Sequence, residues 1–274
     1  MNETTGVSPG ARPHGTTWSV HDLAARAGDR PLFAGVSIVV PPGHWVDLTG
    51  DNGVGKTTLL RLLAGLSRPD GGTIRLGERA IDARDPDWRA NLLYIGHATA
   101  LKAVLDAREN LRSWMALDRG RPVPATEPAA RLSEVGLARR AHVLADRLSA
   151  GQKKRVQMAR MAANRAAIWL LDEPGNALDR DGQNLLQTLV DRHLAAGGSA
   201  VVASHHRLPI AAPSIGLDMN RHAVRRSRPA SATGPASAAA SATAPGPTGP
   251  APGASDPGRR EPGVSDPAPA RTPP

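Results

Sequence analysis

The chain has 274 residues, with 34 Lys and Arg against 25 Asp and Glu, 25 prolines and no cysteine. The lack of cysteine excludes a disulfide scaffold, a thiolate zinc site, an iron–sulfur cluster and a covalently attached c-type haem. No uncharged apolar run approaches the roughly 18 residues of a membrane span, and the polar N-terminus does not resemble a secretory signal. The formal charge of +9 suits nucleic acid or an anionic surface, but solvated arginines explain it equally well. Charge alone therefore selects no function.

Both ends of the chain are poor in large apolar side chains. Of the 46 residues from Pro229 to Pro274, 39 are Pro, Ala, Gly, Ser or Thr. Such a composition cannot bury enough apolar surface to offset the entropy lost on ordering. We therefore expect a disordered N-terminus at 1–16, a folded domain at 17–220 and a disordered Pro/Ala-rich tail at 221–274.

Short apolar runs alternate with amphipathic stretches through the folded part, which predicts an α/β fold with a covered parallel sheet. The early runs, which precede the first long helix, favour an antiparallel edge. Turns are expected at 41–43 and 68–72. The predicted strands are Val36–Val40, Trp45–Leu48, Leu92–Ile95, Ile168–Leu171 and Ala200–Ala203, and the predicted helices are Lys56–Leu66, Arg108–Leu117, Gln152–Ala163 and Gln183–His193.

One loop matches the phosphate-binding pattern G-x-x-x-x-G-K-S/T between a predicted strand and a predicted helix. Its glycines let backbone N–H groups approach phosphate oxygens, and the helix start adds its dipole. Lys56 is the candidate cation for the β and γ phosphates, and the Thr57 hydroxyl is a candidate Mg²⁺ ligand. The predicted phosphate-binding residues are Gly50, Asp51, Asn52, Gly53, Val54, Gly55, Lys56, Thr57 and Thr58.

A second element fits the same chemistry. The apolar run 168–171 ends in Asp172 and Glu173, and carboxylates at the end of a central strand face the ligand crevice. Asp172 is the candidate Mg²⁺ residue, and Glu173 is placed to act as general base on an attacking water.

The segment Leu148, Ser149, Ala150, Gly151 and Gln152 lies about 20 residues before Asp172, and the cationic start Lys153–Arg155 follows it. We expect those cations to face phosphate. The segment resembles the LSGGQ signature of the ABC (ATP-binding cassette) ATPases. Asp179 resembles the D-loop aspartate of that family, and His205 resembles its switch histidine. All of these motifs occur in the order typical of the family between residues 50 and 205.

This resemblance implies a P-loop NTPase fold with a RecA-like, mainly parallel core, an antiparallel β edge subdomain and a small helical subdomain at about 98–147. It implies ATP and Mg²⁺ as cofactors, with Glu173, His205 and Lys56 as catalytic residues. One chain binds a single γ-phosphate, so a second anion site at the signature suggests a head-to-tail homodimer. In the family, two ATP molecules lie between one subunit's P-loop and the other's signature.

Further stretches resemble the CcmA subfamily, the ATPases of the cytochrome c maturation haem exporter. They are residues 32–37, 91–97, Leu101–Lys102, 109–111 and 168–174, and Gly96–His97 places a histidine where most of the family has the Q-loop glutamine. The resemblance implies a peripheral subunit on the cytoplasmic face of the bacterial inner membrane. Its partners would be the permease CcmB, a CcmC-like protein and, indirectly, the haem chaperone CcmE, with no nucleic acid.

Two alternatives remain open. One is the ATPase of another ABC exporter or importer for a drug, lipid or ion. The other is a soluble ABC protein that acts on nucleic acid or ribosomes. The chain also departs from the subfamily pattern at Gly175 and Asn176, and residues 24–29 contain no aromatic side chain to stack on adenine, which leaves Arg26 as a candidate.

Overall fold

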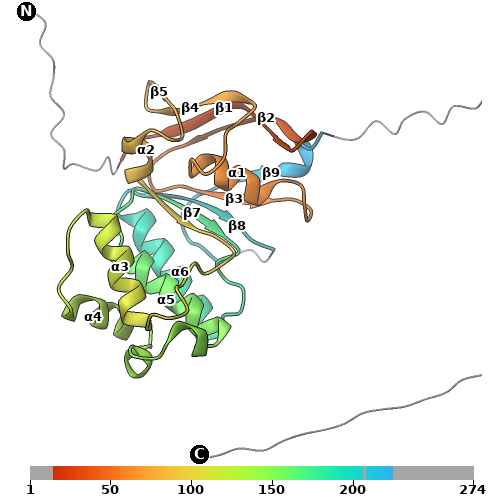
Figure 1. Ribbon diagram of the computed structural model, residues 1–274. Coiled ribbons are helices and arrows are strands. Elements are labelled where there is room, and N and C mark those ends of the chain that lie inside the picture. The colour runs from red at the N-terminus through yellow and green to blue at the C-terminus, as the bar shows by residue number, and fades with distance from the viewer. Residues whose placement is uncertain (1–14, 206–207, 225–274) are drawn as a thin grey trace, which may run out of the picture. The chain divides into compact units, whose positions relative to one another are not determined.

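The computed structural model describes residues 15–205 and 208–224. Their strands form two sheets, one antiparallel and one parallel, with helices between and beside them (Figure 1). No helix in this described part is long and apolar enough to cross a bilayer.

The antiparallel sheet has the order β2-β1-β4-β5. Gly71 and Gly72 lie in this sheet, although we expected the turn at 68–72 to include them. Gly72 has φ +90°, and a Cβ there would lie 2.6 Å from the Asp22 carbonyl oxygen, so only glycine allows β4 to begin this close to β1. The four strands are β1 (Trp18–Ala27), β2 (Arg30–Val40), β4 (Gly71–Leu76) and β5 (Arg79–Ile81).

The parallel sheet has the order β6-β7-β8-β3-β9. The prediction of an antiparallel edge was wrong for β3, which pairs in parallel with β8 and β9. The reason is burial on both sides, since Trp45 enters one hydrophobic core and Val46 the other. Strand β9 was not predicted. The strands are β3 (Trp45–Thr49), β6 (Leu92–Ile95), β7 (Ile168–Asp172), β8 (Ser199–Ala203) and β9 (Ser214–Asp218).

Helices α1, α3, α5 and α6 are close to the predicted ones, although α1 stops earlier than expected; α2 and α4 match no predicted helix. Gly65 has φ +68°, and a Cβ there would collide with the Ala83 carbonyl, so the chain leaves the helix after Leu63. The helices are α1 (Lys56–Leu63), α2 (Pro86–Ala90), α3 (Ala107–Arg119), α4 (Thr126–Glu134), α5 (Ala150–Ala163) and α6 (Arg180–Ala195), with 3-10 turns η1 (Ala138–Arg140), η2 (Ala145–Arg147) and η3 (Met219–Arg221).

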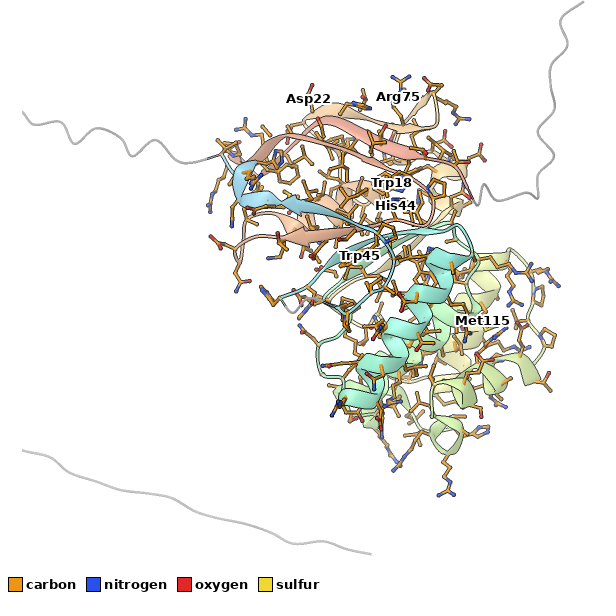
Figure 2. All side chains as sticks on the ribbon, turned by 180° about the vertical axis from the view of Figure 1, so that it is seen from behind. Trp18, Asp22, His44, Trp45, Arg75 and Met115 are labelled. Atoms are coloured by element: carbon orange, nitrogen blue, oxygen red, sulfur yellow. The ribbon has the colours of Figure 1, made fainter. Side chains whose placement is uncertain are left out.

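Two hydrophobic cores cover the two faces of the parallel sheet. On one face α1 lies between the two sheets, and its buried leucines pack with side chains of both. On the other face α3, α5 and α6 share a core with the sheet (Figure 1). The indole of Trp18 in β1, which is labelled in Figure 2, donates a hydrogen bond to Ser199 Oγ in β8 at 2.9 Å and so ties the antiparallel sheet to the parallel one. Strands β7 and β8 are continuous apolar runs because both faces of the parallel sheet are covered.

The fold continues past the predicted domain boundary at 220. Ala223 forms a bridge with Phe33 of β2, and Val224 N–H donates to the Leu32 carbonyl at 3.0 Å. The first four residues of the predicted tail, 221–224, therefore belong to the fold. The remaining tail, 225–274, and residues 1–14 lie outside the described residues, so their disorder stays a prediction.

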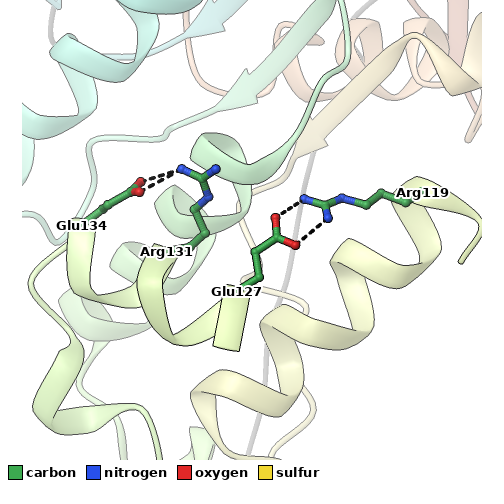
Figure 3. A network of polar contacts seen from close by, with 4 residues as sticks. All are labelled: Arg119, Glu127, Arg131 and Glu134. Atoms are coloured by element: carbon green, nitrogen blue, oxygen red, sulfur yellow. Dashed lines mark hydrogen bonds and ion pairs between the residues drawn. The ribbon is translucent and has the colours of Figure 1, made fainter. Parts of the chain in front are cut away.

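The helical segment after β6 is held by polar contacts as well as by its core. Asp106 and Glu109 form a capping box at the start of α3. Arg119 at the end of α3 binds Glu127 of α4 through two hydrogen bonds of 2.7 and 2.5 Å, and Arg131 binds Glu134 within α4 (Figure 3). The first pair joins two helices, whereas the second lies within one.

Replacing Glu127 with Gln is expected to lower the free energy of unfolding at neutral pH by about 0.5–1 kcal/mol, because the Arg119–Glu127 pair is bidentate but partly exposed. Hydrogen bonding by Arg119 lowers the pKa of Glu127. The stabilisation is therefore complete above the usual carboxyl pKa and is lost as the pH falls through the lowered one. Urea unfolding at neutral pH and below about pH 4 measures this loss.

The matched control is Glu134→Gln on the same helix, whose partner lies only three residues away and is more exposed. We expect little change for it. Equal effects of the two substitutions, or a Glu127→Gln difference that persists in acid, would contradict this prediction.

Candidate functional site

The predicted phosphate loop lies between β3 and α1 and has the backbone shape that its glycines permit. Gly55, the residue before α1, has φ +116°, and a Cβ there would lie 2.8 Å from the Phe33 ring. Because glycine has no side chain to cap the helix, the first N–H groups of α1 are available to an anion. Lys56 Nζ lies across the loop and donates to the carbonyls of Gly50 at 2.6 Å and Asp51 at 3.2 Å.

Thr57 and Asp172 meet as predicted. The Thr57 hydroxyl donates to Asp172 Oδ2 at 2.9 Å, which joins the first turn of α1 to the end of β7. Asp172 is 3% exposed. Tyr94 lies nearby, and its pKa is raised by burial and by the charge of Asp172. The two predicted Mg²⁺ ligands therefore form one oxygen pair below the phosphate loop.

Glu173 follows directly and is held in an unusual backbone conformation. Its φ is +50°, which costs a residue other than glycine about 1–2 kcal/mol. Residues before proline also prefer extended backbone, and Pro174 follows. The Glu173 N–H donates to the Ala203 carbonyl at 2.8 Å. The surrounding contacts must offset this strain, which is typical of functional sites.

The carboxylate of Glu173 faces His205, which follows β8. Glu173 Oε1 lies 3.4 Å from His205 Nε2, and His205 N–H donates to Oε2 at 3.4 Å. His97, at the end of β6, is exposed and lines the same cavity. This cavity of about 300 Å³ brings together predicted residues from four separate segments: Asn52, Gly53, Gly55, Lys56, Thr57, Thr58, His97, Asp172, Glu173 and His205.

The signature residues do not join that cavity. Ser149 caps α5, where its hydroxyl accepts from Gln152 N–H at 3.2 Å and Gln152 Oε1 accepts from Ser149 N–H at 3.0 Å. Leu148 is buried in the core and Ala150 begins the helix. Ser149, Gly151 and Gln152 line a separate cavity of about 710 Å³ together with Arg139 and Arg140. Within one chain, the two predicted anion sites are distinct.

The segment between β7 and α6 packs closely against the start of α5. Asp179 caps α6 by accepting from Gly182 N–H at 2.9 Å, and it also binds Arg155 at 2.8 Å. The Gly182 N–H and the Arg155 guanidinium lower the pKa of Asp179. A Cβ on Gly151 would lie 2.8 Å from the Ala177 carbonyl oxygen, so the signature glycine permits this approach.

The expectation that Lys153–Arg155 faces phosphate was wrong for Lys154, whereas Arg155 lines the cavity at Ser149. Lys154 is 6% exposed and donates to the Glu173 carbonyl at 3.1 Å. Burial lowers its pKa, while the charges of Asp172 and Glu173 oppose that shift. Arg155 binds the Val135 carbonyl and Asp179. Because β7 ends beside α5, cations on this helix reach protein acceptors.

Sequence reasoning missed two contributors to the phosphate site. Asn220 Oδ1 in η3 accepts from Asp51 N–H at 3.1 Å, and Leu32 of β2 lines the cavity. Asn220 lies in a turn with no motif of its own, whereas Leu32 begins the stretch 32–37 that resembles CcmA but was given no role in the site. Arg26, the candidate for adenine, is exposed and donates to the Asp29 carbonyl at 2.5 Å.

The model of the ABC transporter family matches residues 33–176 of this chain. The chain belongs to the ABC transporter family. It is 42% identical over 192 residues, 70% of its length, to the cytochrome c biogenesis ATP-binding export protein CcmA of Nitrosococcus oceani and covers 87% of that protein. It is 44% identical over 195 residues, 71% of its length, to CcmA 2 of Salmonella paratyphi A and covers 92% of it.

These identities place the chain among the CcmA proteins of the ABC family. A putative ABC transporter ATP-binding protein from Pyrococcus furiosus has a similar structure, with a TM-score of 0.65 and 20% identity, over 76% of this chain and all of that one. This confirms the predicted ABC ATPase fold. As an ABC ATPase domain, the chain binds and hydrolyses ATP.

Proposed function

We propose that this chain is the ATP-hydrolysing subunit of a membrane ABC exporter that serves c-type cytochrome maturation, where it drives haem export or the release of the haem-loaded chaperone. The observation that carries the hydrolytic part is the meeting of Glu173, His205, Lys56 and Thr57 in one cavity. The support for the haem pathway is the identity of 42–44% to proteins named CcmA together with His97 at the Q-loop position.

ATP hydrolysis assigns each of these groups a role. The loop 50–58 would surround the phosphates, with Lys56 leaving its loop carbonyls for the β and γ oxygens. A water oxygen forms a bond to the γ-phosphorus while the bond to the β–γ bridging oxygen breaks. Glu173 takes the proton of that water, and His205, 3.4 Å from its carboxylate, orients the water and the γ-phosphate. ADP and phosphate are the products.

The residues present fit Mg²⁺. The Thr57 hydroxyl and the Asp172 carboxylate are hard oxygen donors 2.9 Å apart, and Mg²⁺ needs only one or two protein oxygens because phosphates and water complete its shell. When bound, the ion would neutralise charge on the β and γ phosphates. Thr57 and Asp172 would hold it.

The separation of the two predicted anion sites supports a dimer. The cavity at Ser149, Gly151 and Gln152 shares no lining residue with the cavity of the phosphate loop. A nucleotide on one subunit's phosphate loop would therefore meet the signature of a second copy, with Asp179 at the contact. ATP would hold the two subunits together, and hydrolysis would release them.

The proposed partners are a CcmB permease, a CcmC-like protein and, through them, the chaperone CcmE. The chain would sit on the cytoplasmic face of the inner membrane, and the helical subdomain at about 98–147 would transmit closure of the dimer. This assignment follows the subfamily and needs a test in cells.

That test is complementation in a strain from which the gene is deleted. We expect haem staining of c-type cytochromes to disappear, the parent chain to restore it, and Lys56→Ala to fail although it accumulates to the same level. Affinity capture of the tagged parent should recover a multi-span permease. Unchanged c-type cytochromes together with a new drug, lipid or ion phenotype would instead support the ATPase of another exporter.

A further inference from the structure

Lys154 is a buried cation that the proposed hydrolysis does not use. It lies on α5, two residues after the signature glutamine, and is 6% exposed. Burying an ammonium removes its hydration, so a protein retains it only where other groups compensate. Here its Nζ donates to the Glu173 backbone carbonyl at 3.1 Å. The nearby carboxylates of Asp172 and Glu173 favour its charged form.

The carbonyl that Lys154 holds belongs to the residue with the strained backbone. Glu173 keeps φ +50° before Pro174. Its carbonyl also accepts from Asn176 N–H, but at 3.4 Å, and that donor is neutral. The charged and shorter bond from Lys154 therefore restrains the peptide group between Glu173 and Pro174 more strongly.

We propose that Lys154 is a positioning residue for Glu173, whose carboxylate it keeps beside His205 by holding the Glu173 carbonyl. This inference rests on the proposed role of Glu173 as base. If the restraint were lost, the backbone could relax toward its preferred extended form, and the carboxylate would leave the cavity. Lys154 lies on α5, whose first turn carries the signature residues. The start of this helix would therefore position Glu173 in its own chain and contact the nucleotide bound by the partner.

The test uses the full chain with ATP and Mg²⁺ as probes. Lys154→Met removes the donor and the charge but keeps an unbranched apolar side chain of similar length. We expect kcat to fall by roughly tenfold or more while KM changes by less than about threefold. The urea midpoint is measured beside kcat, since removing this cation leaves the nearby carboxylates of Asp172 and Glu173 without its charge and lowers stability.

Two further variants separate positioning from a structural role. Lys154→Arg keeps a charged donor at this place, and we expect it to recover several-fold in kcat over the Met variant. Arg165→Met removes the same charge at an exposed position beyond the far end of α5, and its kcat should equal that of the parent.

Each result has a defined meaning. A kcat for the Met variant within about threefold of an active parent, or equal losses in folded Met and Arg variants, would overturn this inference alone. If Lys154→Met has a lower urea midpoint than the parent, recovery of kcat in Lys154→Arg supports the proposal. A folded Lys154→Arg variant that does not recover kcat overturns it. A parent that hydrolyses no ATP would overturn the proposed function and this inference together.

Discussion

Glu173→Gln is expected to lower kcat for ATP hydrolysis by about 10²–10⁴-fold while leaving nucleotide binding intact. Gln has the same shape and can still hydrogen-bond His205, whose Nε2 lies 3.4 Å from the carboxylate, but it cannot accept the proton of the attacking water. The phosphate loop is unchanged, so ATP should bind with the parent affinity. The ATP-bound dimer should then persist, because the step that releases it is blocked.

Steady-state phosphate release and nucleotide binding to the full chain measure the two halves of this prediction. Glu127→Gln makes the same chemical change between α3 and α4, outside the cavity, and its kcat should match that of the parent. Undiminished turnover in Glu173→Gln would refute Glu173 as the base. A parallel loss of ATP binding would mean that the substitution disturbs the phosphate loop.

Ser149→Arg is expected to prevent ATP-dependent dimerisation while the monomer still binds ATP. The structure places Ser149 in a cavity separate from the phosphate loop, so a bulky cation there should leave the nucleotide of its own chain undisturbed. It would block the contact with the partner's nucleotide. Size-exclusion chromatography with light scattering, in the Glu173→Gln background where the dimer persists, measures this effect.

Ser149 also caps α5, so the loss of the cap needs a control. Ser149→Ala removes the hydroxyl that accepts from Gln152 N–H and should lower stability by about 1 kcal/mol without adding bulk or charge. We expect this variant to retain a dimer. If the Ser149→Arg monomer no longer binds ATP, Ser149 contacts the nucleotide of its own chain. If Ser149→Arg still forms the dimer, the signature does not lie in the dimer interface.

Much of the local structure was predictable because each predicted strand is a short apolar run bounded by turn residues or charges. The phosphate loop could be assigned since glycine spacing and the flanking strand and helix restrict its backbone. The roles of Asp172 and Glu173 followed from their position at the end of an apolar run. Phosphate binding by Lys154 did not hold, because the sequence shows a charge without showing its acceptor.

Local sequence patterns were enough to predict the α/β class, the phosphate loop, the carboxylate pair and the order of motifs typical of an ABC ATPase. These depend on residues close together in the chain. Three features could be seen only in the folded chain: β3 lies inside the parallel sheet, Asn220 supports the loop at Asp51, and Lys154 holds the Glu173 carbonyl. Such contacts join segments that are far apart in sequence. Packing and desolvation determine which groups meet there, and no local sequence pattern indicates the outcome.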